Sequence, residues 1–479
     1  MHRLNEFHNG ISPVNQLPPE TLARIADLVC HAHRGWSDQA MTMSQVCRYW
    51  RSVVTSYPLV WTGVTVKPVT PASRVTTVLK NSRGLPLHVD FQIHWDEDED
   101  SGEPHRKNSH NGHFRFADSR PPPEPFANLS LFEPHHKHIR SLRILFLYHG
   151  ETHNLGVTQL IQHPFFGRSF DVLDSLSLSF EDTCKDWYRR PFVIPVWSTM
   201  IKGNFPRLRV LTLSGVKRIL QPNFQCPVLE SLSIDFPDDS TESCGRLDDR
   251  EVDFLKQHST LTSLVMKGRV LAQPVKFHRL KSVTLSGEGI RTSIRNGVHP
   301  TSLTVMTSLV IWATDPMAIL ASDADGNSIT YSTRSTGPLR VVETWRSYLQ
   351  FAQDGVEDLY LDLYRDTNGL YDVIRELSNV KTVYIMWAGY GTKRVVKNVA
   401  EALIHPSPRS QVQPNCQKPR IGRWVRYEED AQTAAPRDEA FKSYVSEWGL
   451  EYLCDALESF EPLVSHLVRS PALYRKSET

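Results

Sequence analysis

The stretch Leu208-Arg209-Val210-Leu211-Thr212-Leu213 carries apolar side chains at its first, fourth and sixth positions. Because side chains alternate between the two faces of a strand, the fourth and sixth residues share one face, which we expect to be buried. The motif recurs at Leu142/Leu145/Leu147, Leu173/Leu176/Leu178, Leu229/Leu232/Ile234, Leu261/Leu264/Met266, Leu280/Val283/Leu285, Met306/Leu309/Ile311, Val356/Leu359/Leu361 and Val380/Val383/Ile385. One such strand cannot bury its apolar face alone, so the motif predicts units that stack into a continuous core.

The spacing of these motifs is irregular. Their first positions lie close together at Leu261 and Leu280 but far apart at Met306 and Val356. A further alternating strand is expected over residues 85–93. We therefore predict an α/β fold over residues 67–404, built of parallel strands whose connecting helices and loops differ in length. A compact α/β domain without stacked units is the structural alternative.

The positions between the apolar residues of each motif point away from the core and form a candidate binding face. In the early motifs this face is expected to hold Ile144, Phe146, Tyr148, Ser175, Ser177, Ser179, Thr212, Ser231, Ser233, Ser282 and Thr284. In the late motifs it gathers aromatic and acidic residues, namely Trp312, Asp358, Tyr360, Asp362, Tyr384 and Met386. Trp and Tyr are enriched at interface hot spots, so the late group predicts contact with a basic or amphipathic protein substrate. The alternative is that helices near the C-terminus cover these side chains.

The segment before the motifs is expected to be helical. Leu17-Pro18-Pro19-Glu20 is a helix-start sequence, because proline needs no amide partner in a first turn and an acid is favoured there. One apolar helix face follows at Leu22, Ile25, Ala26 and Val29, and a second helix is indicated by Val46, Tyr49, Trp50, Val53 and Val54. About 50 residues bury too little surface to fold alone. Their apolar residues therefore pack either on the chain's own next domain or on a separate partner protein.

These residues together resemble an F-box, of the kind found in the large F-box-like families of fungi. The resemblance covers about residues 13–64 and rests on Leu17-Pro18-Pro19-Glu20, Val46-Cys47-Arg48-Tyr49-Trp50-Arg51 and Pro58-Leu59-Val60-Trp61. The motifs that follow resemble degenerate leucine-rich repeats. The resemblance implies that residues 11–66 dock on the Skp-type adaptor of a cullin–RING (SCF-type) ubiquitin ligase. The adaptor-binding residues that it implies are Leu17, Pro18, Glu20, Leu22, Ile25, Val46, Cys47 and Trp50.

Three other regions complete the expected organisation. Residues 94–125 contain five consecutive acids, Asp96 to Asp100, and three consecutive prolines, so a disordered insertion is expected there. Residues 405–437 are expected to be a loop or linker. Residues 438–479 are expected to form C-terminal helices that cap the array, because Leu450, Leu453 and Leu457 recur at helical spacing.

Composition limits the classes of function. The formal net charge is +1, so no overall field draws the chain to nucleic acid or to anionic lipid. No stretch approaches the roughly 20 apolar residues that span a bilayer, and the first residues lack the apolar core of a secretory signal. The 7 cysteines form no CxxC pair and predict reduced thiols. We therefore expect a cytoplasmic or nuclear protein that binds neither nucleic acid nor membrane.

The sequence nominates no catalytic residue. The Asp323-Ala324-Asp325-Gly326-Asn327 stretch resembles the opening of a calcium loop, but Ser328 and Arg334 stand where glycine and glutamate are needed, so a turn between strands 317–322 and 328–334 is expected. No metal site and no cofactor are predicted. The expected function is substrate recognition without chemistry of its own. The alternatives are a scaffold that binds the adaptor without driving ubiquitination, and an enzyme whose site is assembled from distant loops.

Overall fold

The computed structural model describes the first part of the chain in long stretches, 12–32, 36–67, 69–96, 127–149, 163–182, 205–215, 224–235, 245–271 and 273–286. The later part is described in shorter pieces, 293, 308–312, 317–323, 325, 327–333, 356–362, 371, 374, 377, 380, 382–386, 398–399, 420–424 and 451–453. The chain divides into two compact units. The N-terminal unit comprises residues 1–261 and 265–269, and the C-terminal unit comprises 262–264 and 270–479.

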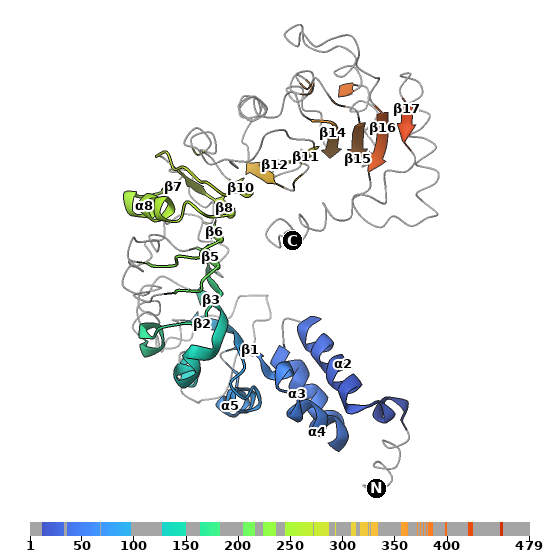
Figure 1. Ribbon diagram of the computed structural model, residues 1–479, viewed down its shortest axis with the longest axis vertical. Helices are drawn as coiled ribbons and strands as arrows, with labels where there is room; N and C mark the ends of the chain where they lie inside the picture. The colour runs from blue at the N-terminus through green and yellow to red at the C-terminus, as the bar shows by residue number, and fades with distance from the viewer. Residues whose placement is uncertain are drawn as a thin grey trace, which may run out of the picture. The chain divides into compact units, whose positions relative to one another are not determined.

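The N-terminal unit opens with three α-helices that lie side by side next to the first strand (Figure 1). A 3₁₀ turn η1 (Pro13–Gln16) leads into α2 (Pro19–Ala32), and α3 (Trp36–Val46), α4 (Arg48–Ser56) and the 3₁₀ turn η2 (Pro58–Trp61) follow. The helix start at Pro18-Pro19 and the helix end at Tyr57-Pro58 are confirmed. Helix α3 was not predicted, because its sequence is largely polar. As a result Val46 ends α3 and does not belong to the helix that carries Trp50.

The expected α/β class with a large, mostly parallel sheet is confirmed. In the N-terminal unit six strands pair in sequence order, all in parallel. They are β1 (Gly63–Val66), β2 (Leu87–Asp96), β3 (Ile139–His149), β4 (Ser175–Asp182), β5 (Val210–Ser214) and β6 (Ser231–Asp235). Strand β8 (Ser263–Lys267) is divided between the two units, and β7 (Gly245–Arg246) pairs with β9 (Arg269–Val270) in a separate two-stranded sheet.

The apolar positions of the motifs form the core of this unit. All three are buried at Leu173/Leu176/Leu178, Leu208/Leu211/Leu213 and Leu229/Leu232/Ile234. The first motif is the exception, because Leu145 and Leu147 are only half-buried. The buried residues there are Ile139, Leu142, Ile144 and Phe146, so the motif begins three residues earlier than predicted. The expectation that Ile144 and Phe146 lie on the binding face is therefore wrong, since both are in the core.

The core contains a second row of residues that the leucine pattern did not reveal. Three residues before the first apolar position of successive motifs stand the half-buried His136 and the buried Phe170, Phe205, Cys226, His258 and Phe277. Neighbouring rings in this row are in contact, with centroids 6.4 Å apart for His136–Phe170 and 6.0 Å for Phe170–Phe205. The repeating unit of the structure is therefore longer than the motif read from the sequence, and it begins with an aromatic residue or its replacement.

Backbone hydrogen bonds repeat with the same period. The amides of Arg209 and Val210 both donate to the carbonyl oxygen of Asp174, and the amides of Glu230 and Ser231 both donate to that of Arg209. Strands β5 and β6 therefore each begin by donating two N–H groups to the residue that precedes the neighbouring strand. This pairing fixes the register at the point where each strand starts.

Short helices and turns connect the strands. They are α5 (Ala72–Asn81), α6 (Ala127–Ser130), η3 (Glu133–His138), η4 (Pro164–Gly167) and α8 (Asp249–Gln257). Helix α8 begins with a capping box, in which Asp248 accepts from the amide of Glu251 at 2.9 Å and Glu251 accepts from that of Asp248 at 3.0 Å. Val252, Phe254 and Leu255 of this helix are buried.

In the C-terminal unit the strands have the order β10-β13-β12-β11-β14-β15-β16-β17. Their bounds are Ser282–Ser286, Ser328–Thr333, Met317–Ser322, Ser308–Trp312, Asp358–Asp362, Thr382–Met386, Arg420–Trp424 and Glu451–Leu453, respectively. Strands β12 and β13 are antiparallel, which confirms the turn predicted between them, and β11 and β12 are also antiparallel. The other pairings described for this unit are parallel.

Three predicted regions differ from the structure where it describes them. Strand β2 runs to Asp96, so the first residues of the predicted insertion 94–125 belong to the sheet, and the rest of that insertion lies outside the described residues. Strand β16 lies within the predicted linker 405–437 and pairs with β15. Strand β17 replaces part of the helices predicted over 438–479. The described residues of both regions add strands to the sheet, because an apolar run of a few residues suits either structure.

We predict that Gly215→Ala destabilises the N-terminal unit by roughly 3 kcal/mol. Gly215 has φ +69°, and a Cβ there would lie 2.3 Å from the backbone oxygen of Phe180. Gly84→Ala is the matched control, because Gly84 has φ +75° but the nearest atom to its Cβ is 3.9 Å away. In that variant the free energy of unfolding is expected to fall by only about 1 kcal/mol, from the strain of placing alanine in the left-handed conformation. Denaturant unfolding of both variants gives the comparison, and equal losses would contradict the predicted clash.

Candidate interaction surfaces

The N-terminal helices keep several large apolar side chains in contact with solvent. Leu28 is 57% exposed and Val46 is 55% exposed. We call the whole set the N-terminal apolar surface, and its members are Val14, Leu17, Pro18, Ile25, Leu28, Val46 and Trp50, all exposed or half-buried. Single exposed apolar residues are ordinary, but a group of them on one segment marks a site of protein interaction.

Helix geometry places part of this surface on one side of α2. Ile25 and Leu28 are three residues apart on α2, so they are neighbours on its surface, and Pro18 directly precedes the helix. The side of α2 with Leu22, Ala26 and Cys30 is buried. Helix α2 therefore keeps Ile25 and Leu28 at least partly exposed beside its buried side.

Two hydrogen bonds bring α4 against the segment that precedes α2. The indole Nε1 of Trp50 donates to Oδ1 of Asn15 at 2.6 Å. The hydroxyl of Tyr49 donates to the carbonyl oxygen of Leu17, also at 2.6 Å. Both rings pack against a buried cluster that includes Leu22. These contacts join Val14 and Leu17 to the end of the surface formed by Val46 and Trp50.

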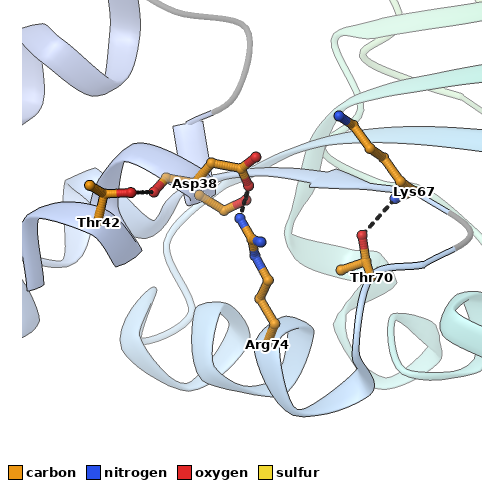
Figure 2. A network of polar contacts seen from close by, with 6 residues as sticks. Asp38, Thr42, Lys67, Thr70 and Arg74 are labelled. Atoms are coloured by element: carbon orange, nitrogen blue, oxygen red, sulfur yellow. Dashed lines mark hydrogen bonds and ion pairs between the residues drawn. The ribbon is translucent and has the colours of Figure 1, made fainter. Parts of the chain in front are cut away.

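The other side of the helical segment packs against the elements that follow it in the chain. Helix α3 contacts β1 and η2, and α5 contacts the same two elements. Trp61 is 1% exposed, and its indole donates to the carbonyl oxygen of Val54 at 2.8 Å. Figure 2 shows the ion pair between Asp38 of α3 and Arg74 of α5, together with the Thr42 hydroxyl on the Asp38 carbonyl oxygen at 2.8 Å. The expected packing of the helical segment on the chain's own next elements is therefore confirmed, and packing on a separate partner stays a prediction.

The predicted adaptor-binding residues divide by exposure. Pro18, Glu20 and Val46 are exposed, and the half-buried ones are Leu17, Ile25, Cys47 and Trp50. Leu22 is fully buried in the chain's own core. Sequence reasoning did not single out Val14 and Leu28 for this surface, and it quoted Leu59 only within the F-box resemblance; the structure leaves all three exposed. Leu28 lies three residues from Ile25, so helical spacing contained a signal for it.

A second candidate surface lies on the sheet of the N-terminal unit, on the side opposite the leucine core. Strand register aligns its side chains in three rows, Ser141/Ser175/Val210/Ser231, Arg143/Ser177/Thr212/Ser233 and Leu145/Ser179/Ser214/Asp235. Strands β4, β5 and β6 thereby bring seven hydroxyl groups together, and we call them the hydroxyl face. Its half-buried members are Ser175, Ser177, Thr212, Ser214, Ser231 and Ser233, whereas Ser179, which was also expected to be accessible on this face, is buried.

Charged pairs flank the hydroxyl face on both sides. Nη1 of Arg143 lies 3.8 Å from Oδ2 of Asp90, and Nζ of Lys267 lies 3.1 Å from Oδ2 of Asp235. Each flank therefore contributes both signs of charge. Such a surface offers hydrogen bonds to a polar partner without a strong field of either sign.

The late aromatic and acidic group lies on β11, β14 and β15. Parallel pairing places Trp312 beside Asp362, and Tyr360 beside Tyr384. Tyr360 is 8% exposed, so little of its ring is accessible, and Asp358 is half-buried. The side chains of Trp312, Asp362, Tyr384 and Met386 lie outside the described residues, as do the helices expected to cover them.

Among the described residues, Cys226 and His258 come nearest to the arrangement of a catalytic nucleophile and its base. Sγ of Cys226 lies 3.2 Å from Nε2 of His258, whose Nδ1 lies 2.8 Å from the carbonyl oxygen of Phe254. Both side chains are buried. Burial raises the pKa of Cys226 from 9.0 to about 12 and lowers the pKa of His258. A reactive thiol needs the opposite shift and access to a substrate. The two residues occupy equivalent places in the aromatic row, so their hydrogen bond replaces a ring contact between neighbouring repeats.

The calcium-like stretch is a turn closed by its own side chains. Asp323 Oδ1 accepts from the amides of Asp325 and Asn327, at 3.0 and 2.8 Å, and Oδ2 accepts from Nδ2 of Asn327 at 2.7 Å. Among the residues that the structure describes, no group of three His, Cys, Asp or Glu side chains is arranged to hold a metal ion. In the same part of the chain, no helix has the length and apolar character needed to cross a bilayer.

Comparison with known proteins found no match, either among protein-family models or among curated proteins.

We predict that His258→Gln makes the free energy of unfolding less sensitive to acid. In the folded protein the pKa of His258 lies below its ordinary value of 6.5 because burial disfavours the cation. The unfolded chain therefore binds the proton first as the pH falls below 6.5, and folding loses stability there but not at higher pH. Denaturant unfolding at pH 8 and pH 5 measures this loss. Burial also lowers the pKa values of His135 and His163. Their share of the acid-dependent loss of stability is therefore the same in wild type and in His258→Gln.

An equal loss of stability in wild type and His258→Gln would contradict this assignment.

On the alkaline side, stability is expected to fall above pH 9.0, because the unfolded Cys226 thiol loses its proton there while the folded thiol keeps it until about 12. A Cys226→Ala variant is expected to lose this alkaline contribution.

Proposed function

We propose that this protein is the substrate-recognition subunit of a cullin–RING ubiquitin ligase of the SCF type. In this proposal the N-terminal helices act as an F-box that docks on a Skp-type adaptor, and the sheet that follows, an irregular leucine-rich array, binds the target protein. The observation that carries the proposal is the N-terminal apolar surface. Its side chains are exposed or half-buried although the same helices bury other apolar residues against η2 and β1.

The composition of this surface suits a stable interface. Interfaces of ordinary size bury about 1,600 Å² in total, with an apolar centre and a polar rim. Leu17, Pro18, Ile25, Leu28 and Val46 provide the apolar centre, and exposed Glu20 in the first turn of α2 belongs to the rim. The side chain of Leu22 has no exposed area to offer to the adaptor. Its role in this proposal is therefore to support the surface from the core.

The hydroxyl face is the target-binding surface that we favour. Its hydroxyl groups both donate and accept hydrogen bonds, and their small size leaves the sheet open to a polar polypeptide segment. A role for Trp312, Asp358, Asp362, Tyr384 and Met386 in target binding stays a prediction. Tyr360 is better suited to supporting its neighbours in the sheet, since it is buried.

Such a protein acts as a tether and needs no catalytic residue. Binding the adaptor at one surface and the target at another raises the effective concentration of the target near the ubiquitin-charged enzyme. A scaffold that binds the adaptor without ubiquitination uses the same apolar surface. Recovery of a cullin together with the adaptor separates the two roles, because only the ligase role requires it.

We predict that Val46→Lys weakens binding to a purified Skp-type adaptor by about ten-fold or more, because it places a charge in the apolar centre of the interface. Folding is expected to be unchanged, since Val46 is exposed. Val228→Lys is the matched control, because Val228 is 45% exposed outside the helical segment. Isothermal titration with the full chain measures both affinities. Equal binding by the two variants, or no binding by wild type, would refute adaptor docking at this surface.

We predict that Ser177→Arg abolishes recovery of target proteins while adaptor recovery stays the same. The arginine side chain would cover the centre of the hydroxyl face and block hydrogen bonds from its neighbours. Ser73→Arg is the control, because Ser73 is exposed on α5. Quantitative affinity purification from cells gives both readings at once. Target recovery that matches the control would rule out the hydroxyl face as the binding surface.

A further inference from the structure

We propose that Asn15, held by Trp50, is a positioning residue that presets the entry to α2 for partner binding. The inference rests on the proposed docking function and adds to it a device that keeps Leu17 and Pro18 in place before the adaptor arrives. In this role Trp50 acts on the interface through Asn15 and not only through its own exposed ring.

The segment that carries Asn15 is the four-residue 3₁₀ turn η1. Turn η1 buries none of its residues, and Ser12, which precedes it, makes no side-chain cap. A four-residue 3₁₀ turn has few internal hydrogen bonds and no apolar anchor of its own here. Its position therefore depends on contacts made by its side chains and by the backbone of Leu17.

The indole of Trp50 can serve only one such partner. Trp has a single N–H donor and no acceptor, so the group 2.6 Å from Nε1 must be the amide oxygen of Asn15. Sγ of Cys47 lies 3.9 Å from the same oxygen. With its donor engaged inside the chain, Trp50 presents only the apolar part of its ring to a partner. This separates two functions of one residue, packing at the surface and holding Asn15.

Tyr49 provides a second point of attachment from the same helix. Its hydroxyl donates to the carbonyl oxygen of Leu17, two residues beyond Asn15. Consecutive residues of a helix point about 100° apart, so Tyr49 and Trp50 reach the segment from different directions. Two bonds from one rigid helix fix both the position and the orientation of Leu17 and Pro18. Both rings are in turn fixed by packing on Leu22 and Val53.

Preorganisation of this kind acts on affinity. A segment that must become ordered on binding loses backbone and side-chain entropy at that moment, and this loss weakens the complex. A typical net hydrogen bond corresponds to a change of about five-fold in an equilibrium constant. Removing the Asn15–Trp50 bond is therefore expected to weaken adaptor binding by about five-fold, without loss of the buried core.

A double-mutant cycle on the full chain tests this inference, with affinity for a purified Skp-type adaptor as the measurement. Asn15→Ala removes the acceptor, and Trp50→Phe removes the donor but keeps an aromatic ring. Each is expected to bind about five-fold more weakly than wild type, and the double variant no more weakly than either one, because the bond is lost only once. Asn15→Asp keeps an acceptor oxygen and is expected to restore most of the affinity.

Asn128→Ala is the matched control, because Asn128 also makes a part-buried side-chain hydrogen bond, to the Thr70 carbonyl oxygen at 3.1 Å, but outside the helical segment. It is expected to bind the adaptor as wild type does. Unfolding midpoints of all variants are expected to stay close to wild type, so a structural loss is distinguished from a loss of positioning. Additive effects, or wild-type binding by Asn15→Ala, would overturn the inference and leave adaptor docking standing. Absence of binding by wild type overturns both.

Discussion

Each short strand of this protein has apolar side chains that only its neighbours can remove from water. Burial of one Leu side chain contributes roughly 1.5–3 kcal/mol, and two or more apolar side chains are buried on each of the strands β1 to β6. The strands must therefore run in parallel and in register, so that Leu142, Leu176 and Leu211 meet. The same register aligns the side chains of the opposite side. The hydroxyl face is thus a direct consequence of how the core packs.

The first strand of a stacked sheet has no neighbouring strand on one side, and the helical segment packs there. Among the described strands, β1 lies at the end of the sheet beside β2, and α3 contacts it. An uncovered strand edge is prone to pair with other chains, so terminal units are usually capped. The helices therefore have two duties in the proposed function. One side of them completes the fold, which explains buried Trp61, and the other keeps the N-terminal apolar surface in solvent.

The core also shows how one repeat position accepts different chemistry. Phe170 and Phe205 stack in the aromatic row, whereas Cys226 and His258 hydrogen bond at the equivalent place. A buried polar group is tolerated only when it is hydrogen-bonded, and here each satisfies the other. Residue type alone would nominate such a pair as catalytic. Its burial and its place in the row identify it as packing between repeats.

The sequence by itself determined the strands of the leucine motifs, their parallel pairing and the start of α2, since these follow from local periodicity and from the backbone limits of proline. Helix α3 escaped prediction because its sequence is largely polar, and the true start of the first motif at Ile139 escaped it because the residues there are apolar on both faces of the strand. Periodicity placed Leu22 and Ala26 on the buried side of α2, but it did not show that Ile25 and Val29 of the same predicted face would be only half-buried. Only the tertiary structure decided this, because the burial of a side chain depends on what packs against it, and β1 and α5 together with η2 cover only one side of the helical segment.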